Sequence, residues 1–277
     1  MACTSILYRL ASLGLASAAL VFGTPASADA FVSTFGVFSG QFASAPVSLS
    51  RTNSQNTPSF VSQSFASADL NTATLRASIT GESLSACCFT GNIVSATARI
   101  SDDVTFLGAG SSVLVNLSLL VDGTFAMTGV ATSATVDAVL GLGVDSASLH
   151  LVRNLNPGNF GDFLNGSVTG SPGSFLNKTL NSANAGLVLS VIVPTNVAIS
   201  FTALLSLQGQ GAQFDTLSAN FANTAQVALS LPVGYSFASA SGHFLSAPVP
   251  EPETYAMILA GLGLLGFVAR RRKQQAA

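Results

Sequence analysis

Residues 113–121 read VLVNLSLLV, with an apolar side chain at every odd position. A period of two places successive side chains on opposite faces of an extended strand, so these positions predict one buried face, with Asn116 and Ser118 on the other. Asp122-Gly123 follows directly and is a dipeptide typical of a type I′ turn. The sequence therefore predicts a β-hairpin whose second strand covers residues 124–131.

Similar strand-like runs recur along the chain, at residues 186–193, 197–207, 225–231 and 235–241. Turn residues separate them, at Pro194-Thr195-Asn196, Gln208-Gly209-Gln210-Gly211 and Pro232-Val233-Gly234. Short strands at this spacing predict an all-β protein. A β-sandwich or jelly-roll-like ectodomain is the expected architecture, with an elongated β-sheet as the alternative.

Three segments have less regular patterns. Residues 50–58 are rich in Ser, Thr, Asn and Gln, and residues 154–172 in Asn, Gly and Pro, so both predict surface connections that could also bind a ligand. Phe31, Phe35, Phe38 and Phe42 follow a helical spacing, whereas the Val, Thr, Gly and Ser around them favour a strand. Both interpretations of residues 31–42 remain open.

The N-terminus has the pattern of a secretion signal. Arg9 precedes an apolar run over residues 10–22, and Ala26-Ser27-Ala28 is an A-x-A cleavage site. We therefore expect a signal helix within residues 1–28 and a mature chain that begins at Asp29.

The C-terminus combines three features: the stretch Val249-Pro250-Glu251-Pro252, an apolar run from Tyr255 to Ala269, and the cations Arg270, Arg271, Arg272 and Lys273. A spanning helix needs about 20 apolar residues, so this shorter run predicts a marginal transmembrane helix that suits a temporary anchor. Cations after the helix stay in the cytoplasm, which places the chain before it on the other side. The two prolines favour an extended backbone that an enzyme could recognise. An ordinary C-terminal anchor is the alternative.

This tail resembles the PEP-CTERM domain of Gram-negative bacteria. The resemblance implies a chain that is exported, held transiently in the inner membrane and recognised by an exosortase at Pro250, Glu251 and Pro252, before its release to the cell surface or the extracellular matrix. The resemblance also implies a producing strain that makes exopolysaccharide, so exopolysaccharide is the expected partner. The resemblance covers about a tenth of the chain, with a looser similarity over residues 221–245, and implies no particular activity.

The expected organisation is a signal peptide (1–28), a β-rich exported ectodomain (29–248), the sorting tail (249–273) and a tail end (274–277). Between Asp29 and Val249 the chain has five basic and ten acidic residues. This mild acidity without a basic cluster excludes the charge pattern of a nucleic-acid-binding protein.

Motifs for catalysis are absent from the sequence. It has two histidines and contains no HExxH, GxSxG or GxxxxGK[ST] pattern. Asp145, Ser146 and His150 lie close together, but no nucleophile elbow surrounds the serine. Glu82 is the only glutamate before the tail, whereas a glycosidase needs two carboxylates across a cleft. We expect a protein that is not an enzyme, with a hydrolase as the least favoured reading.

No cofactor is expected, and no metal site is assigned. Asp102-Asp103 would point to opposite faces of a strand, so the pair predicts a turn or half of a weak calcium site. Cys87 and Cys88 are adjacent, and a bond between them would close a strained ring, so free thiols or pairing between molecules are the alternatives.

The expected function is that of a surface or matrix structural protein that associates with exopolysaccharide or with copies of itself. Uncharged Ser, Thr and Asn side chains provide many hydrogen-bonding groups, and exposed strand edges would add self-association. A glycan-binding or adhesive module is the alternative. The absence of Trp weakens it, and the seventeen Phe between Asp29 and Val249 fit core filling better than sugar platforms.

Overall fold

The computed structural model describes residues 28–36, 39–58, 60–84, 92–129, 132–155, 161–169, 175–181, 184–211 and 215–245. Every regular element in these ranges is a β-strand, which confirms the all-β prediction. No helix within them is long and apolar enough to cross a membrane. The predicted signal helix, the transmembrane helix, Cys87 and Cys88 all lie outside the described residues.

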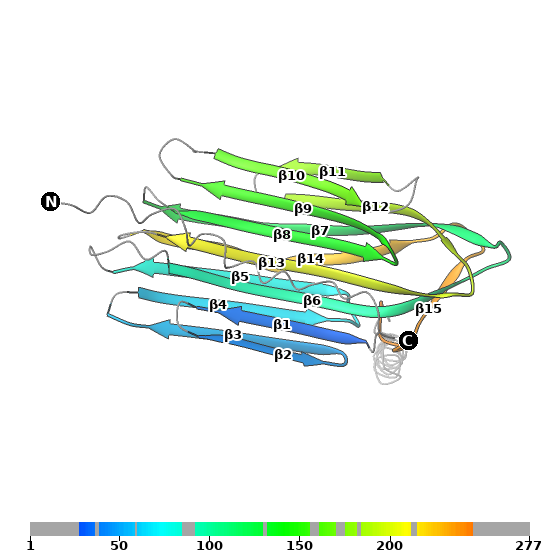
Figure 1. Cartoon of the computed structure of the whole chain (residues 1–277), viewed down its shortest axis with the longest axis horizontal. Helices are drawn as coiled ribbons and strands as arrows, with labels where there is room; N and C mark the ends of the chain where they lie inside the picture. The colour runs from blue at the N-terminus through cyan, green and yellow to red at the C-terminus, as the bar shows by residue number, and fades with distance from the viewer. Residues whose placement is uncertain are drawn as a thin grey trace, which may run out of the picture.

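The strands form two antiparallel sheets (Figure 1). Sheet A has the order β10-β9-β8-β13-β6-β1-β2, with β15 also paired to β6, and sheet B has the order β11-β12-β7-β14-β5-β4-β3. Their bounds are β1 (Asp29–Phe35), β2 (Gly40–Ala45), β3 (Ser48–Asn56), β4 (Phe60–Asp69), β5 (Thr74–Ser83), β6 (Asn92–Leu107), β7 (Ser112–Thr128), β8 (Ser133–Leu142), β9 (Asp145–Asn154), β10 (Gly161–Thr169), β11 (Phe175–Asn181), β12 (Asn184–Pro194), β13 (Ala198–Gly211), β14 (Thr216–Ser230) and β15 (Ser236–Ser239).

The two sheets lie as two layers, and one hydrophobic core draws on both of them (Figure 1). Strands β13 and β6 of sheet A contact β5 of sheet B, and β6 also contacts β4. The alternating residues of VLVNLSLLV lie where the pattern predicts: Val113, Val115, Leu117, Leu119 and Val121 are all at most 3% exposed. Burial of one such side chain contributes about 1.5–3 kcal/mol, so this alternation is a main source of the layered fold.

The predicted turn at Asp122-Gly123 is wrong, because β7 continues through it to Thr128. Asp122 pairs with β12 on one side and with β14 on the other, and pairing with both neighbours outweighs the local turn preference. The irregularity lies in β14 instead, where the register shifts between Asn220 and Thr224. The glycine serves close packing, since a Cβ at Gly123 would lie 2.3 Å from Cδ1 of Phe221.

Other polar or glycine-rich segments that predicted connections are also strands. Residues 50–58 fall mostly in β3, and residues 161–169 of the second predicted connection form β10. Both strands lie at sheet edges, where polar residues are favoured because one side of the strand faces solvent. The Gln208–Gly211 segment continues β13; a Cβ at Gly209 would lie 2.1 Å from Cδ2 of Leu217, so this glycine also provides packing space.

The ambiguous Phe-rich segment is extended, with Phe31 and Phe35 in β1 and Phe42 in β2. The two predicted turns at Pro194–Asn196 and Pro232–Gly234 are confirmed. Asn196 and Gly234 adopt the positive φ values of 58° and 88°, which turns of this kind require.

Two hydroxyl groups are buried where β1 meets β4. Thr34 and Ser64 are each 1% exposed, and their hydroxyl groups have no hydrogen-bond partner among the described residues. A buried hydroxyl without a partner costs free energy on folding because it loses its bonds to water. This region therefore stabilises the two layers less than the apolar centre does.

Replacing Thr34 with valine is expected to raise the free energy of unfolding by about 1 kcal/mol, since the shape is kept and the unpaired hydroxyl is removed. Urea unfolding of the mature chain measures this. The matched control is Thr97→Val on the outer face of β6, which removes a hydroxyl that lies 2.8 Å from Oγ of Ser206 and should not stabilise the protein. A loss of stability in Thr34→Val would show that its hydroxyl has a partner beyond the described protein atoms.

Candidate functional site

The outer face of sheet A carries many polar side chains that could meet a ligand. We call the outward residues of β13, β8, β9 and β10 the polar face; all of them are partly or fully exposed. Its polar members include Thr202, Ser206, Gln208, Thr135, Asp137, Ser146, Ser148, His150, Asn165, Ser167 and Thr169, and the apolar Val139, Val152 and Leu204 lie on the same face. Because the strands pair in register, these side chains form rows across the sheet.

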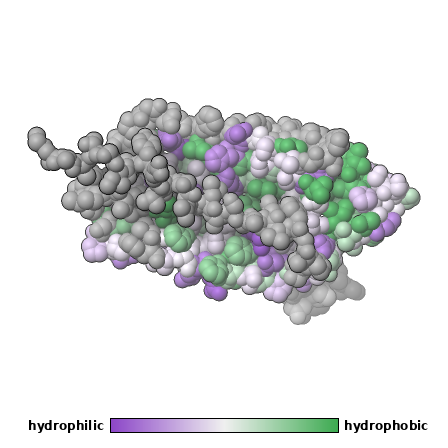
Figure 2. Space-filling view, viewed as in Figure 1, coloured by the Kyte–Doolittle hydropathy of each residue, from purple (hydrophilic) through white to green (hydrophobic). Residues whose placement is uncertain are grey.

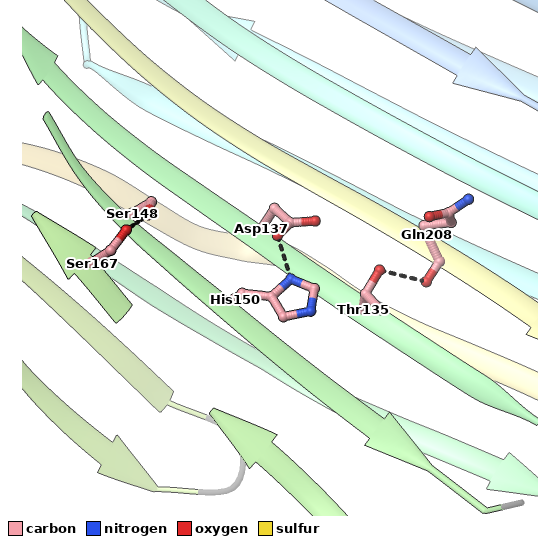
Figure 3. Close-up of polar contacts among 6 residues, drawn as sticks. All are labelled: Thr135, Asp137, Ser148, His150, Ser167 and Gln208. Atoms are coloured by element: carbon pink, nitrogen blue, oxygen red, sulfur yellow. Dashed lines mark hydrogen bonds and ion pairs between the residues drawn. The ribbon is translucent and has the colours of Figure 1, made fainter. Parts of the chain in front are cut away.

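A hydrogen-bonded pair of side chains lies on the polar face (Figure 3). Nδ1 of His150 is 2.6 Å from Oδ1 of Asp137, its direct cross-strand neighbour, and the side chains are 48% and 44% exposed. Beside it, the hydroxyl oxygens of Ser148 and Ser167 lie 2.7 Å apart. Exposed pairs of this kind contribute at most about 1 kcal/mol, so the cluster is mainly a hydrogen-bonding surface.

Asp145, Ser146 and His150 do not form a triad. Asp145 is buried on the inner face of β9, whereas Ser146 and His150 point outward. Four residues separate the latter two along an extended strand, a distance of about 13 Å. Figure 3 shows that the imidazole also points away from Ser148 and Ser167. The described residues therefore bring His150 and the carboxylate of Asp137 together, and neither Asp145 nor Ser146 belongs to that contact.

Asp102 and Asp103 lie within β6 and not in a turn, so that prediction is wrong. Asp102 is fully buried, while Asp103 lies on the outer face. The opposite orientations agree with the period of the strand and prevent the two carboxylates from sharing an ion. Among the residues that the structure describes, no group of three His, Cys, Asp or Glu could hold a metal.

The carboxylate of Asp102 instead holds the end of the folded chain. It accepts hydrogen bonds from Oγ of Ser239 and Oγ of Ser241, each at 2.6 Å, and from the backbone N–H of Ser241 at 3.3 Å. The backbone N–H of Asp103 donates a further bond at 2.8 Å. A buried carboxylate is stable only with such partners. We call residues 236–245 the C-terminal clasp.

The C-terminal clasp also reaches sheet B. Phe244 is 2% exposed, and its ring packs on Phe201 with centroids 4.3 Å apart. The backbone N–H of Leu245 donates to the carbonyl of Leu70, in the turn between β4 and β5. His243 is exposed, and its Nδ1 lies 3.1 Å from Oδ1 of Asn71. Both sheets thus fix the chain up to Leu245, a few residues before Pro250.

A second outer surface lies on the hairpin of β1 and β2 and includes three phenylalanines. Phe42 is 79% exposed and Phe35 is 43% exposed. Phe31 is partly exposed and carries the guanidinium of Arg99, whose Cζ lies 5.0 Å from the ring centroid. Figure 2 shows a hydrophobic patch in the lower part of the view, where Figure 1 places β1 and β2. We call Phe31, Phe42 and Phe35 the aromatic strip.

The sequence did not identify the aromatic strip, because its phenylalanines were expected to fill the core. A signal was present: Phe31 and Phe35 alternate with Val32 and Thr34, which are buried in β1, as is Ala30. Phenylalanine on the face opposite to a buried Val–Thr pair must point outward if the segment is a strand.

Comparison with known proteins identifies the C-terminus. Residues 248–273 match the family model of the PEP-CTERM protein-sorting motif, which confirms the resemblance found in the sequence. No curated protein and no solved structure matches the chain. The matched segment includes Pro250, Glu251, Pro252 and the cations 270–273, which lie outside the described residues, as does Ala26. Ala28 is the first described residue, and β1 begins directly after it.

Proposed function

We propose that the β-rich ectodomain is a structural protein of the cell surface or extracellular matrix, because the chain carries a PEP-CTERM protein-sorting motif, which supports sorting by an exosortase-type system. In this proposal the ectodomain associates with exopolysaccharide and has no catalytic role. The motif implies export and a membrane-anchored C-terminus before processing. The remaining steps, from signal cleavage to final location, are part of the proposal.

The observation that carries the proposal is the position of the motif directly after a folded, weakly charged β-domain. The C-terminal clasp fixes the chain at Leu245, and the matched segment begins at Pro248. A single enzyme cut near Pro250, Glu251 and Pro252 would therefore release the ectodomain whole. Two stacked sheets with a common core support a β-sandwich assignment for this ectodomain.

The N-terminal boundary is consistent with removal of a signal peptide after Ala28. Asp29 is the first residue of β1 and pairs with Ser101 of β6. Its carboxylate lies 3.4 Å from the guanidinium of Arg99, so the first residue of the expected mature chain is already part of the fold. We propose that residues 1–28 direct export and that the helix of Tyr255–Ala269 holds the chain in the inner membrane until processing.

Uncharged polar side chains on the polar face supply the means of association. In the rows of that face only Asp137 and His150 are ionisable, and they pair with each other. Hydroxyl and amide groups can bond to polysaccharide hydroxyls or to the same face of another copy without strong electrostatic repulsion. Many weak contacts of this kind suit a matrix component. A dedicated glycan-binding module is the second candidate, and the exposed aromatic strip is the observation that favours it.

Fractionation of a producing host tests the proposed function. We expect the protein to leave the cells with the polysaccharide when a culture is sheared, and to sediment with that polysaccharide. In the same host without polysaccharide synthesis, the protein should instead appear free in the medium. Equal distribution in the two strains would contradict an association with exopolysaccharide, and release of sugars from the polysaccharide by the purified protein would indicate a hydrolase.

A further inference from the structure

The aromatic strip has a regular geometry that the hairpin imposes. In the pairing of β1 with β2, Phe31 lies opposite Ser44, Phe42 opposite Ser33, and Phe35 opposite Gly40. Alternate residues of β1 face the core, so all three rings lie on the outer face of sheet A. Diagonal neighbours across two antiparallel strands are about 7–8 Å apart, so the rings follow one another in a staggered line along the hairpin.

The surroundings hold two of the rings in place. A Cβ at position 40 would lie 2.6 Å from Cδ2 of Phe35, so Gly40 allows that ring to lie directly against the strand. At the other end, Cζ of Arg99 lies 5.0 Å from the ring centroid of Phe31, which stays partly exposed, and the guanidinium forms an ion pair of 3.4 Å with Asp29. Side chains that are already stacked or ion-paired lose less conformational entropy when a ligand binds than freely rotating side chains do. The ring of Phe42, between them, is the most exposed large hydrophobic side chain among the described residues of β1 and β2.

Hydrogen-bonding groups accompany the rings. The row that contains Phe42 continues with Ser33 and Thr97, and the row that contains Phe31 has Ser44 at the edge. Among the described residues, the charged groups beside the strip are Arg99 and Asp29, which pair with each other. An aromatic plane packs on the apolar face of a pyranose ring, while nearby hydroxyls bond to its equatorial hydroxyls. The surface thus has a line of apolar rings, hydroxyl groups beside that line and almost no net charge.

We propose that the aromatic strip binds one extended, neutral polysaccharide chain that runs along the β1–β2 hairpin. The inference rests on the proposed function and deepens it, because it gives the ectodomain a specific point of contact with exopolysaccharide. Successive sugar residues stack on Phe31, Phe42 and Phe35, and Ser33, Ser44 and Thr97 bond to the chain from the side. Phe42 makes the largest contact, since its ring is 79% exposed.

A second copy of the protein fits this surface less well. One phenylalanine buries about 150–250 Å² when it is fully covered, and these three are already partly covered by their own strand. A stable protein interface needs about 800 Å² on each partner. The strip is therefore too small for a stable dimer, whereas a polymer that meets many copies of the ectodomain gains affinity through repeated weak contacts.

Affinity electrophoresis of the full chain in mild detergent tests the proposal, with the host's purified exopolysaccharide and with hydroxyethylcellulose as a neutral linear reference. Wild-type protein should be retarded by at least one of the two polymers. Phe42→Ala is expected to weaken that binding about tenfold or more, and Phe42→Tyr should retain it because the ring remains. Phe42 is exposed, so neither substitution should affect folding.

The matched control is Phe65→Ala, which removes a phenylalanine from the outer face of β4 in sheet B. It should bind as wild type does. Equal binding by wild type and Phe42→Ala would show that the aromatic strip is not the binding surface, and would leave the proposed function intact. No binding by wild type to either polymer would also contradict polysaccharide binding by the strip. The fractionation experiment tests the proposed function separately. A concentration-dependent dimer that Phe42→Ala abolishes would assign the strip to a second copy instead.

Discussion

Replacing Pro250, Glu251 and Pro252 together with alanine is expected to leave export intact and to keep nearly all of the protein in the inner membrane. The substitution removes the two fixed φ angles and the carboxylate that distinguish this stretch, so the exosortase loses its recognition element. The apolar run and the four cations remain, so the chain still stops in the membrane. Immunoblots of membrane, surface and medium fractions measure the distribution.

A proline outside the matched segment provides the control. Pro232 lies exposed in the turn before β15, and Pro232→Ala should be released as wild type is. Unchanged release of the triple variant would show that the motif does not direct processing of this chain. Absence of the variant from every fraction would point to degradation, and pulse-labelling would then still reveal whether newly made protein reaches the surface.

Asp102→Ala is expected to have the largest effect on stability, with a loss of about 3 kcal/mol in the free energy of unfolding. The substitution leaves the hydroxyls of Ser239 and Ser241 without their buried acceptor and opens a cavity where the carboxylate lay. The C-terminal clasp would then detach from β6. Urea unfolding of the mature chain, followed by far-ultraviolet circular dichroism, measures the loss.

Asp103→Ala is the matched control, because the same side chain is removed one residue further along, on the outer face of β6. We expect the free energy of unfolding to change by no more than about 0.5 kcal/mol. Combining Asp102→Ala with Ser241→Ala should cost less than the sum of the single changes, since both remove the same hydrogen bond. A loss below about 1 kcal/mol for Asp102→Ala alone would contradict the role of the clasp.

Alternation of apolar residues was sufficient to predict the strand at 113–121 and the all-β class, because burial of one face requires that period. The dipeptide Asp122-Gly123 was misleading for a physical reason. Turn preference is a local property, whereas β7 is bonded to β12 and β14 on both sides of this point. Only the partner strands, which are distant in sequence, determine that the chain continues straight.

The aromatic strip illustrates the same limit. A separation of four residues places Phe31 and Phe35 on one face in a helix and also in a strand, so spacing alone did not distinguish the two structures. The outward direction of the rings follows from sheet B, which covers the opposite face of β1 through contacts with β3 and β4. The Asp102–Ser241 contact was equally inaccessible, since 139 positions separate the two residues.

The central claim is that a folded ectodomain, bounded by Asp29 and by the sorting motif, reaches the surface as a processed chain. Intact mass of the protein from an exopolysaccharide-producing host, together with the fraction that contains it, tests this claim most directly. We expect a species that begins at Asp29, ends near Pro250-Glu251-Pro252 and lies at the surface or in the matrix. A chain with its full C-terminus that remains in the inner membrane would contradict the account and indicate an ordinary anchored protein.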